Sequence, residues 1–170
     1  MHVHLISFDI PYPANYGGAI DVFYKLISLR NAGVDVTLHC FHKPGRRPQP
    51  LLGELCDHVY YYERRVGWQS NLSLLPYNVM SRRSSLLVSH LLEDSDPIIF
   101  EALSTTACMN DHRLDSRVKL FRECNIEHDY FNGLAQAEQS VRRRMFYRLE
   151  IQILRTSGEG RLAHYSIVAQ

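Results

Sequence analysis

The sequence predicts an α/β fold: a parallel sheet of about six strands, covered by helices on both faces. Two observations carry this prediction. Short apolar runs rich in β-branched and aromatic residues recur along the chain, and their lack of polar alternation is typical of strands buried on both faces. These runs alternate with stretches of helical spacing, an order that favours parallel strands joined by helices. No internal repeat or linker divides residues 1–170, so one domain is expected.

In the first half of the chain, strands are expected at residues 3–8, 34–41 and 58–63. A helix is expected at 19–32, where Gly33 follows as a stop signal. Its apolar residues recur near helical spacing, at Ile20, Phe23, Tyr24, Ile27 and Ala32. The many prolines and glycines at 43–50 predict a loop.

The second half continues the pattern with expected helices at 72–80, 85–92 and 105–112, and expected strands at 98–102, 118–123 and 164–170. The longest helical pattern runs over 128–155. Apolar residues recur there at three- and four-residue steps, namely Leu134, Ala137, Val141, Met145, Leu149 and Ile153.

Composition narrows the class of protein. The chain is 45% hydrophobic and 22% charged with a net charge of +1, so no global field favours a nucleic-acid partner. No apolar run reaches the roughly 18 residues of a membrane span, and no signal peptide is visible. The four cysteines show no metal-binding spacing, which predicts reduced thiols in a cytoplasmic protein with no metal: Cys40, Cys56, Cys108 and Cys124.

The stretch between the first strand and the first helix is the first candidate site. In parallel sheets, ligands bind beyond the carboxyl ends of the strands. Gly17 and Gly18 stand there at a helix start, where bare backbone and unpaired N–H groups favour a phosphate. The pattern matches neither the dinucleotide fingerprint nor a Walker loop, and a simple tight turn remains an alternative.

Polar residues also follow the fourth and fifth expected strands. Glu101 ends the apolar run at 98–101, and Asn125, Glu127 and His128 stand between the fifth strand and the longest helix. Acidic residues at a helix start are equally typical of caps. Their position at the expected ligand edge favours a binding role, and the Glu101 carboxylate is expected to face an open cleft near Gly17 and Gly18.

Three segments together resemble the N-terminal domain of bacterial GT-B glycosyltransferases of the retaining kind, related to enzymes of capsule and lipopolysaccharide synthesis. Residues 11–41 resemble the opening of that domain, with a proline-containing loop and a Gly-Gly before the first helix. Residues 98–109 resemble its fourth strand end, and 122–138, with its "NIEH", resemble a more specific family segment. The resemblance covers essentially the whole chain.

The resemblance implies the acceptor-binding half of an enzyme with two Rossmann-like domains, which transfers a hexose from a nucleotide sugar to a polysaccharide or lipid-linked acceptor. The domain that holds most of the nucleotide sugar has no counterpart here, so this chain alone is expected to be inactive. The implied contacts with the donor phosphate and sugar are Tyr16, Gly17 and Gly18, and those with the acceptor are Asp9, Glu101, Asn125, Glu127 and His128. No cofactor or metal is implied.

Two family positions differ here. The histidine before "NIEH" is Cys124, and the glycine after the fourth strand's glutamate is Ala102. Basic groups such as Arg82-Arg83 and Arg142–Arg144 are compatible with contact at the inner face of the membrane, although a solvated surface is the more ordinary reason for such groups. The alternative to a transferase is a non-catalytic α/β module that binds a phosphorylated or sugar ligand.

Overall fold

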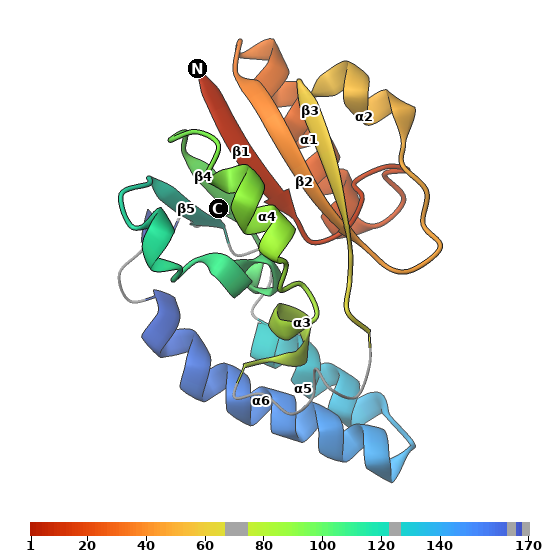
Figure 1. Ribbon diagram of the computed structural model, residues 1–170. Coiled ribbons are helices and arrows are strands. Elements are labelled where there is room, and N and C mark those ends of the chain that lie inside the picture. Colours follow the sequence, from red (N-terminus) through yellow and green to blue (C-terminus); the bar gives the residue numbers. More distant parts are fainter. Residues whose placement is uncertain (67–74, 123–126, 163–165, 168–170) are drawn as a thin grey trace.

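The computed structural model describes residues 1–66, 75–122, 127–162 and 166–167. It confirms the α/β prediction. The strands, all paired in parallel, are β1 (His2–Ser7), β2 (Asp35–His42), β3 (His58–Glu63), β4 (Ile98–Glu101), β5 (Lys119–Arg122) and the two-residue β6 (Ser166–Ile167). Their order, β3-β2-β1-β4-β5-β6, is that of a Rossmann-like sheet (Figure 1).

Helices cover both faces of this sheet. They are α1 (Gly17–Asn31), α2 (Pro50–Leu55), α3 (Tyr77–Met80), α4 (Ser85–Leu91), α5 (Glu127–Ala137) and α6 (Val141–Leu162), with short 3-10 turns at Leu103–Cys108 and His112–Leu114. In Figure 1, α1 and α2 lie on one side of the sheet and α4 lies on the other. One apolar core joins β1 and β2 to α1, and a second joins the strands to α4, α5 and α6.

Helix α1 is present, but its buried face differs from the expected one. Its buried residues are Ala19, Val22 and Leu26, whereas Ile20 and Tyr24 are 41% and 60% exposed. The helix also starts at Gly17, two residues before the expected start, so both glycines belong to its first turn. The buried face includes the small Ala19, so the spacing of the large apolar residues alone predicts the wrong face.

The single helix expected over 128–155 is wrong. The chain forms two helices, α5 and α6, and residues 138–140 separate them. Glu138 holds the break, because its Oε1 accepts from the Ser140 N–H at 2.9 Å and its carbonyl accepts from Arg144. Val141, Met145 and Leu149 were expected to face the core, yet each is more than half exposed.

Two other segments depart from expectation. The proline at the end of the expected loop is the first residue of α2, a position where its missing N–H costs nothing. The helix expected at 72–80 is described only from residue 75, and α3 occupies Tyr77–Met80.

A hydrogen-bonded chain of rings runs between the sheet and α4. His4 Nδ1 lies 2.9 Å from His39 Nε2, and His39 Nδ1 lies 2.8 Å from the Tyr62 hydroxyl, which lies 2.7 Å from His90 Nδ1. Burial lowers the pKa of His39 well below its ordinary value and also lowers the pKa of His4. Both rings are therefore neutral at pH 7.

The core on the α1 side predicts a stability test. Leu26→Ala should lower the free energy of unfolding by about 2–5 kcal/mol, because the buried side chain leaves a cavity between α1 and the sheet. Ile20→Ala, on the exposed side of the same helix, should cost less than about 1 kcal/mol. Urea unfolding measures both, and equal losses would contradict the placement of α1.

Candidate functional site

The loop after β1 is held by the carboxylate of Asp9. Its Oδ1 accepts from the Ile10 N–H at 2.8 Å and its Oδ2 accepts from the Tyr16 hydroxyl at 3.1 Å. Burial, followed by the neighbouring Asp9 charge, raises the pKa of Tyr16 to about 12. Of the expected ligand contacts, Asp9 and Tyr16 are thus brought together, and Asp9 supports the Tyr16 side chain from within the loop.

The two glycines differ in what surrounds them. A Cβ added at Gly17 would meet no atom within 4 Å, whereas one at Gly18 would lie 2.5 Å from Cζ of Phe8. Tyr16, which precedes α1, makes no side-chain cap, so the first-turn N–H groups receive no side-chain acceptor from it. Gly17 is therefore open to a ligand, while a side chain at Gly18 would force the protein's own Phe8 ring to move.

An arginine-lined cavity is formed by residues of α3, α4 and the two 3-10 turns that follow β4. Its volume is about 580 Å³, and its charged and polar lining includes Arg65, Arg82, Arg83, Ser84, Asp111 and Arg113. Arg65 follows β3 and Ser84 precedes α4, which runs back across the sheet, so this wall of the cavity lies at the carboxyl edge. Two guanidinium hydrogen bonds from Arg113 lower the pKa of Asp111 to about 2, so this carboxylate stays ionised.

Arg82 connects the cavity to the loop. The Arg82 side chain lines the cavity, and its Nε donates to the carbonyl of Phe8 at 3.0 Å. The Phe8 ring is the one that contacts Gly18. Directly after β3, Arg64 donates through Nη2 to the Ser81 hydroxyl, while its buried Nε has no hydrogen-bond partner among the described residues. An anion is the natural acceptor for such groups.

Glu101 does not face an open cleft, so that expectation is wrong. Its side chain is fully buried at the end of β4, where it pairs with Lys25 of α1 and with Arg122 of β5. The Arg122 Nη1 to Glu101 Oε2 distance is 3.1 Å, and Arg122 also pairs with Asp21. A carboxylate can be buried at a strand end when cations from two elements converge on it.

Ala102 occupies a backbone conformation that favours glycine. Its φ is 67° and its ψ is 157°, at the turn from β4 into the 3-10 segment. The Thr105 hydroxyl donates to the Ala102 carbonyl at 2.9 Å and helps to hold this turn. A glycine at this position would adopt the conformation without strain, whereas Ala102 is strained in it.

The remaining candidates are less fully described. Asn125 and Cys124 lie outside the described residues. Glu127 begins α5 and His128 follows it, but their side chains also lie outside the described part. Their assignment as acceptor contacts stays a prediction.

Two clusters were missed from the sequence. Arg65, Arg82 and Arg83 line one cavity, whereas the sequence suggested only a membrane contact or a solvated surface for basic groups of this kind. A second cluster joins His2 and His4 to Asp94 and Asp96 at the amino edge of the sheet. The sequence does contain a His-x-His in the first strand and an Asp-x-Asp before the fourth strand. The expectation of no metal did not take these two patterns into account.

Comparison with known proteins gives one relative to report. The chain is 31% identical over 153 residues to an uncharacterized 44.6 kDa protein in the cps (capsule) region of Klebsiella pneumoniae. The aligned part covers 86% of this chain but 39% of that protein, so the chain spans well under half the length of its relative. No family model matches the chain, and no solved structure matches it. Among the helices described, none has the length and apolar character needed to cross a membrane.

The buried carboxylate predicts a stability effect. Glu101→Gln should lower the free energy of unfolding by about 3 kcal/mol, because it removes the charge that compensates Lys25 and Arg122. Glu63→Gln, at the exposed end of β3, is the matched control and should change stability by less than about 0.5 kcal/mol. Chemical unfolding at pH 7 measures both variants, and equal stabilities of Glu101→Gln and Glu63→Gln would contradict the buried ion cluster.

The strained turn at Ala102 predicts a substitution that increases stability. Ala102→Gly should raise the free energy of unfolding by about 1 kcal/mol, since relief of backbone strain exceeds the entropy that glycine adds to the unfolded chain. Ala107→Gly, in the 3-10 segment that follows, should instead destabilise. A loss of stability in Ala102→Gly would show that the turn is not strained.

Proposed function

We propose that this chain is the acceptor-side domain of a glycosyltransferase that moves a hexose from a nucleotide sugar to a cell-surface polysaccharide or lipid-linked glycan. One observation carries the proposal most directly. The carboxyl edge of the sheet combines an open glycine at the start of α1 with an arginine-lined cavity of about 580 Å³. That edge is where parallel α/β sheets bind their ligands.

The leaving group of such a transfer is a nucleoside diphosphate. The first-turn N–H groups of α1 and its dipole favour negative charge, and the open face of Gly17 lets a phosphate approach the backbone. Tyr16, 40% exposed and held by Asp9, offers a flat apolar face and a hydroxyl beside it. We assign this end of the site to the donor's phosphate and sugar.

The cavity suits the acceptor. Arg65, Arg82 and Arg83 supply cationic groups, and guanidinium groups pair well with phosphate oxygens. A glycan linked to a lipid through phosphate would present such oxygens next to its sugars. The relative's place in a capsule region agrees with an acceptor of this kind.

The buried Glu101 changes its expected role. With its carboxylate enclosed between Lys25 and Arg122, we assign it to fixing α1 against β4 and β5 rather than to direct contact with sugar hydroxyls. Asn125, Glu127 and His128 remain proposed acceptor contacts at the start of α5. The donor's nucleotide is proposed to bind mainly to a second domain of the complete protein.

Helix α6 favours peripheral contact with an anionic membrane surface. Its exposed residues combine the apolar Val141, Met145 and Leu149 with Arg142 and Arg143. Apolar side chains beside cations are typical of helices that lie in a lipid interface. This contact would bring the site to a lipid-linked acceptor at the inner face of the membrane.

The open glycine provides the test of transfer. In the complete protein, Gly17→Val should leave the fold intact and raise the KM for the nucleotide sugar about tenfold or more, because the added side chain blocks backbone approach. Gly53→Val, at an equally open position in α2, is the control and should leave the kinetics unchanged.

The outcomes separate the alternatives. Unchanged kinetics in a folded Gly17→Val protein would remove the loop from the donor site. If the complete protein transfers no sugar from any nucleotide sugar, yet this chain binds sugar phosphates, it is a non-catalytic binding module.

A further inference from the structure

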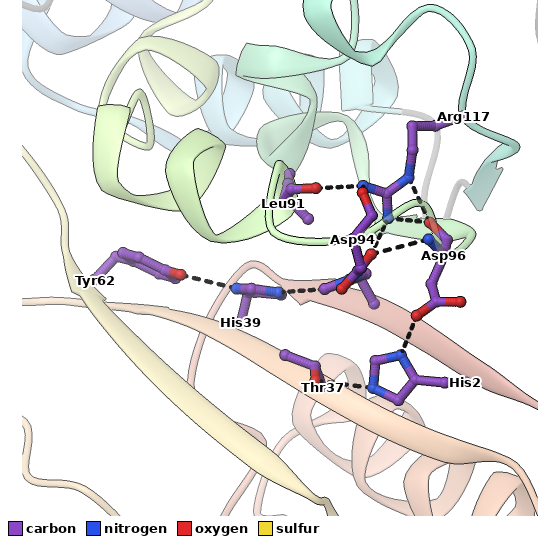
Figure 2. A network of polar contacts seen from close by, with 9 residues as sticks. His2, Thr37, His39, Tyr62, Leu91, Asp94, Asp96 and Arg117 are labelled. Carbon is purple, nitrogen blue, oxygen red and sulfur yellow. Dashed lines mark hydrogen bonds and ion pairs between the residues drawn. The ribbon is translucent and has the colours of Figure 1, made fainter.

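A second polar site lies at the amino edge of the sheet, opposite the proposed ligand edge. His2 and His4 stand two residues apart on one face of β1, and Asp94 and Asp96 belong to the segment between α4 and β4. One ligand atom from each of the four lies within 4.8 Å of the others. Figure 2 shows the side chains of His2, Asp94 and Asp96 converging there.

We propose that these four residues bind a divalent metal ion, with two imidazole nitrogens and two carboxylate oxygens as ligands. His2 Nδ1 lies 2.9 Å from Asp96 Oδ2, and His4 Nε2 lies 2.9 Å from Asp94 Oδ2. Ligands about 2.1 Å from a tetrahedral Zn²⁺ are about 3.4 Å apart, so small side-chain shifts accommodate the ion. Mixed nitrogen and oxygen ligands in this number fit zinc better than magnesium or calcium.

Each imidazole already has a partner on its other nitrogen. His2 Nε2 lies 3.0 Å from the Thr37 hydroxyl, and His4 Nδ1 lies 2.9 Å from His39 Nε2. Such second hydrogen bonds fix the orientation of a metal-binding histidine and set which nitrogen is free to coordinate. Both partners come from β2, the strand that pairs with β1.

The carboxylates are positioned by Arg117. Its guanidinium donates to the carbonyls of Leu91, Asp94 and Asp96, which shapes the segment that carries both ligands (Figure 2). It also donates through Nη2 to Asp94 Oδ1 at 2.9 Å, and the Asp96 N–H donates to the same oxygen. His4 Nε2 lies 3.0 Å from Oδ1 and 2.9 Å from Oδ2 of the same carboxylate, and Oδ2 is the oxygen left for the ion.

Charge and access both permit a cation. The two carboxylates carry more negative charge than the single guanidinium of Arg117 offsets. The His4 side chain is 3% exposed, but those of His2, Asp94 and Asp96 are 27%, 34% and 40% exposed, which leaves an entry path. An ion there would join the start of β1 to the segment before β4, and it would act as a structural clamp far from the ligand edge.

Metal binding would reverse the hydrogen-bonded chain behind His4. With neutral rings and no metal, one order satisfies every contact: His90 Nδ1–H donates to Tyr62, Tyr62 to His39, His39 to His4, and His4 Nε2–H to Asp94. Coordination through His4 Nε2 needs that lone pair. Each ring then donates in the opposite direction, and the His90 proton moves from Nδ1 to Nε2. No proton is gained or lost along the chain.

The test uses the untagged chain, stripped of metal by a chelator and then titrated with Zn²⁺. We expect binding of one ion per chain by calorimetry and a higher unfolding temperature with the ion bound. His2→Asn and Asp96→Asn should each weaken binding by more than the roughly 10–100-fold typical of losing a supporting partner. His112→Asn, whose side chain is 88% exposed elsewhere, should bind as the wild type does.

A second readout does not depend on affinity. Nitrogen-15 shifts of the histidine rings should report the change of tautomer at His90 when Zn²⁺ binds, and Tyr62→Phe should abolish that change while Zn²⁺ binding persists. Absence of stoichiometric Zn²⁺ binding, or binding that His2→Asn and Asp96→Asn leave intact, would overturn the proposal. In that case the cluster is a hydrogen-bonded network only.

Discussion

The buried carboxylate of Glu101 is the constraint on which the carboxyl edge depends. It sits at the end of β4 with no exposure to solvent, and its charge is compensated by Lys25 of α1 and Arg122 of β5. A charge removed from water is tolerated only when such partners stay in place, so α1, β4 and β5 are held in one arrangement. The start of α1 and the strained turn at Ala102 both take their positions from it.

The two edges of the sheet have opposite character. Arginines surround an open cavity and the uncapped start of α1 at the carboxyl edge. Histidines and aspartates, already hydrogen-bonded to one another, gather at the amino edge. We therefore place anion recognition at the first edge and a structural cation at the second, with β1 reaching both.

Much of the fold could be predicted from the sequence because it depends on local apolar patterns. The strands are short uninterrupted apolar runs, and their alternation with helices was enough to predict a parallel sheet. The break between α5 and α6 was missed because it depends on hydrogen bonds of Glu138 and not on apolar spacing. The buried face of α1 was misplaced because it is formed by Ala19, Val22 and Leu26, and not by the larger Ile20 and Tyr24.

The site was predicted less well, because its contacts join residues that are far apart in the sequence. Asp9 and Tyr16 were placed in the loop after the first strand, but the hydrogen bond between them was not predicted. Position at a strand end could not show that Glu101 would be enclosed by Lys25, since that partner is 76 residues away in the chain. The arginines of the cavity also come from separate segments, so only the fold reveals them as one group.

The central claim is that the carboxyl edge binds phosphate-bearing sugars. The most direct measurement is a backbone amide NMR titration of this chain with a soluble sugar linked through diphosphate to a short lipid. We predict saturable shifts at Gly17, Arg83 and Ser84, with the amides of His2 and Asp96 unchanged. Shifts confined to the amino edge, or no saturable shift at the carboxyl edge, would contradict the account.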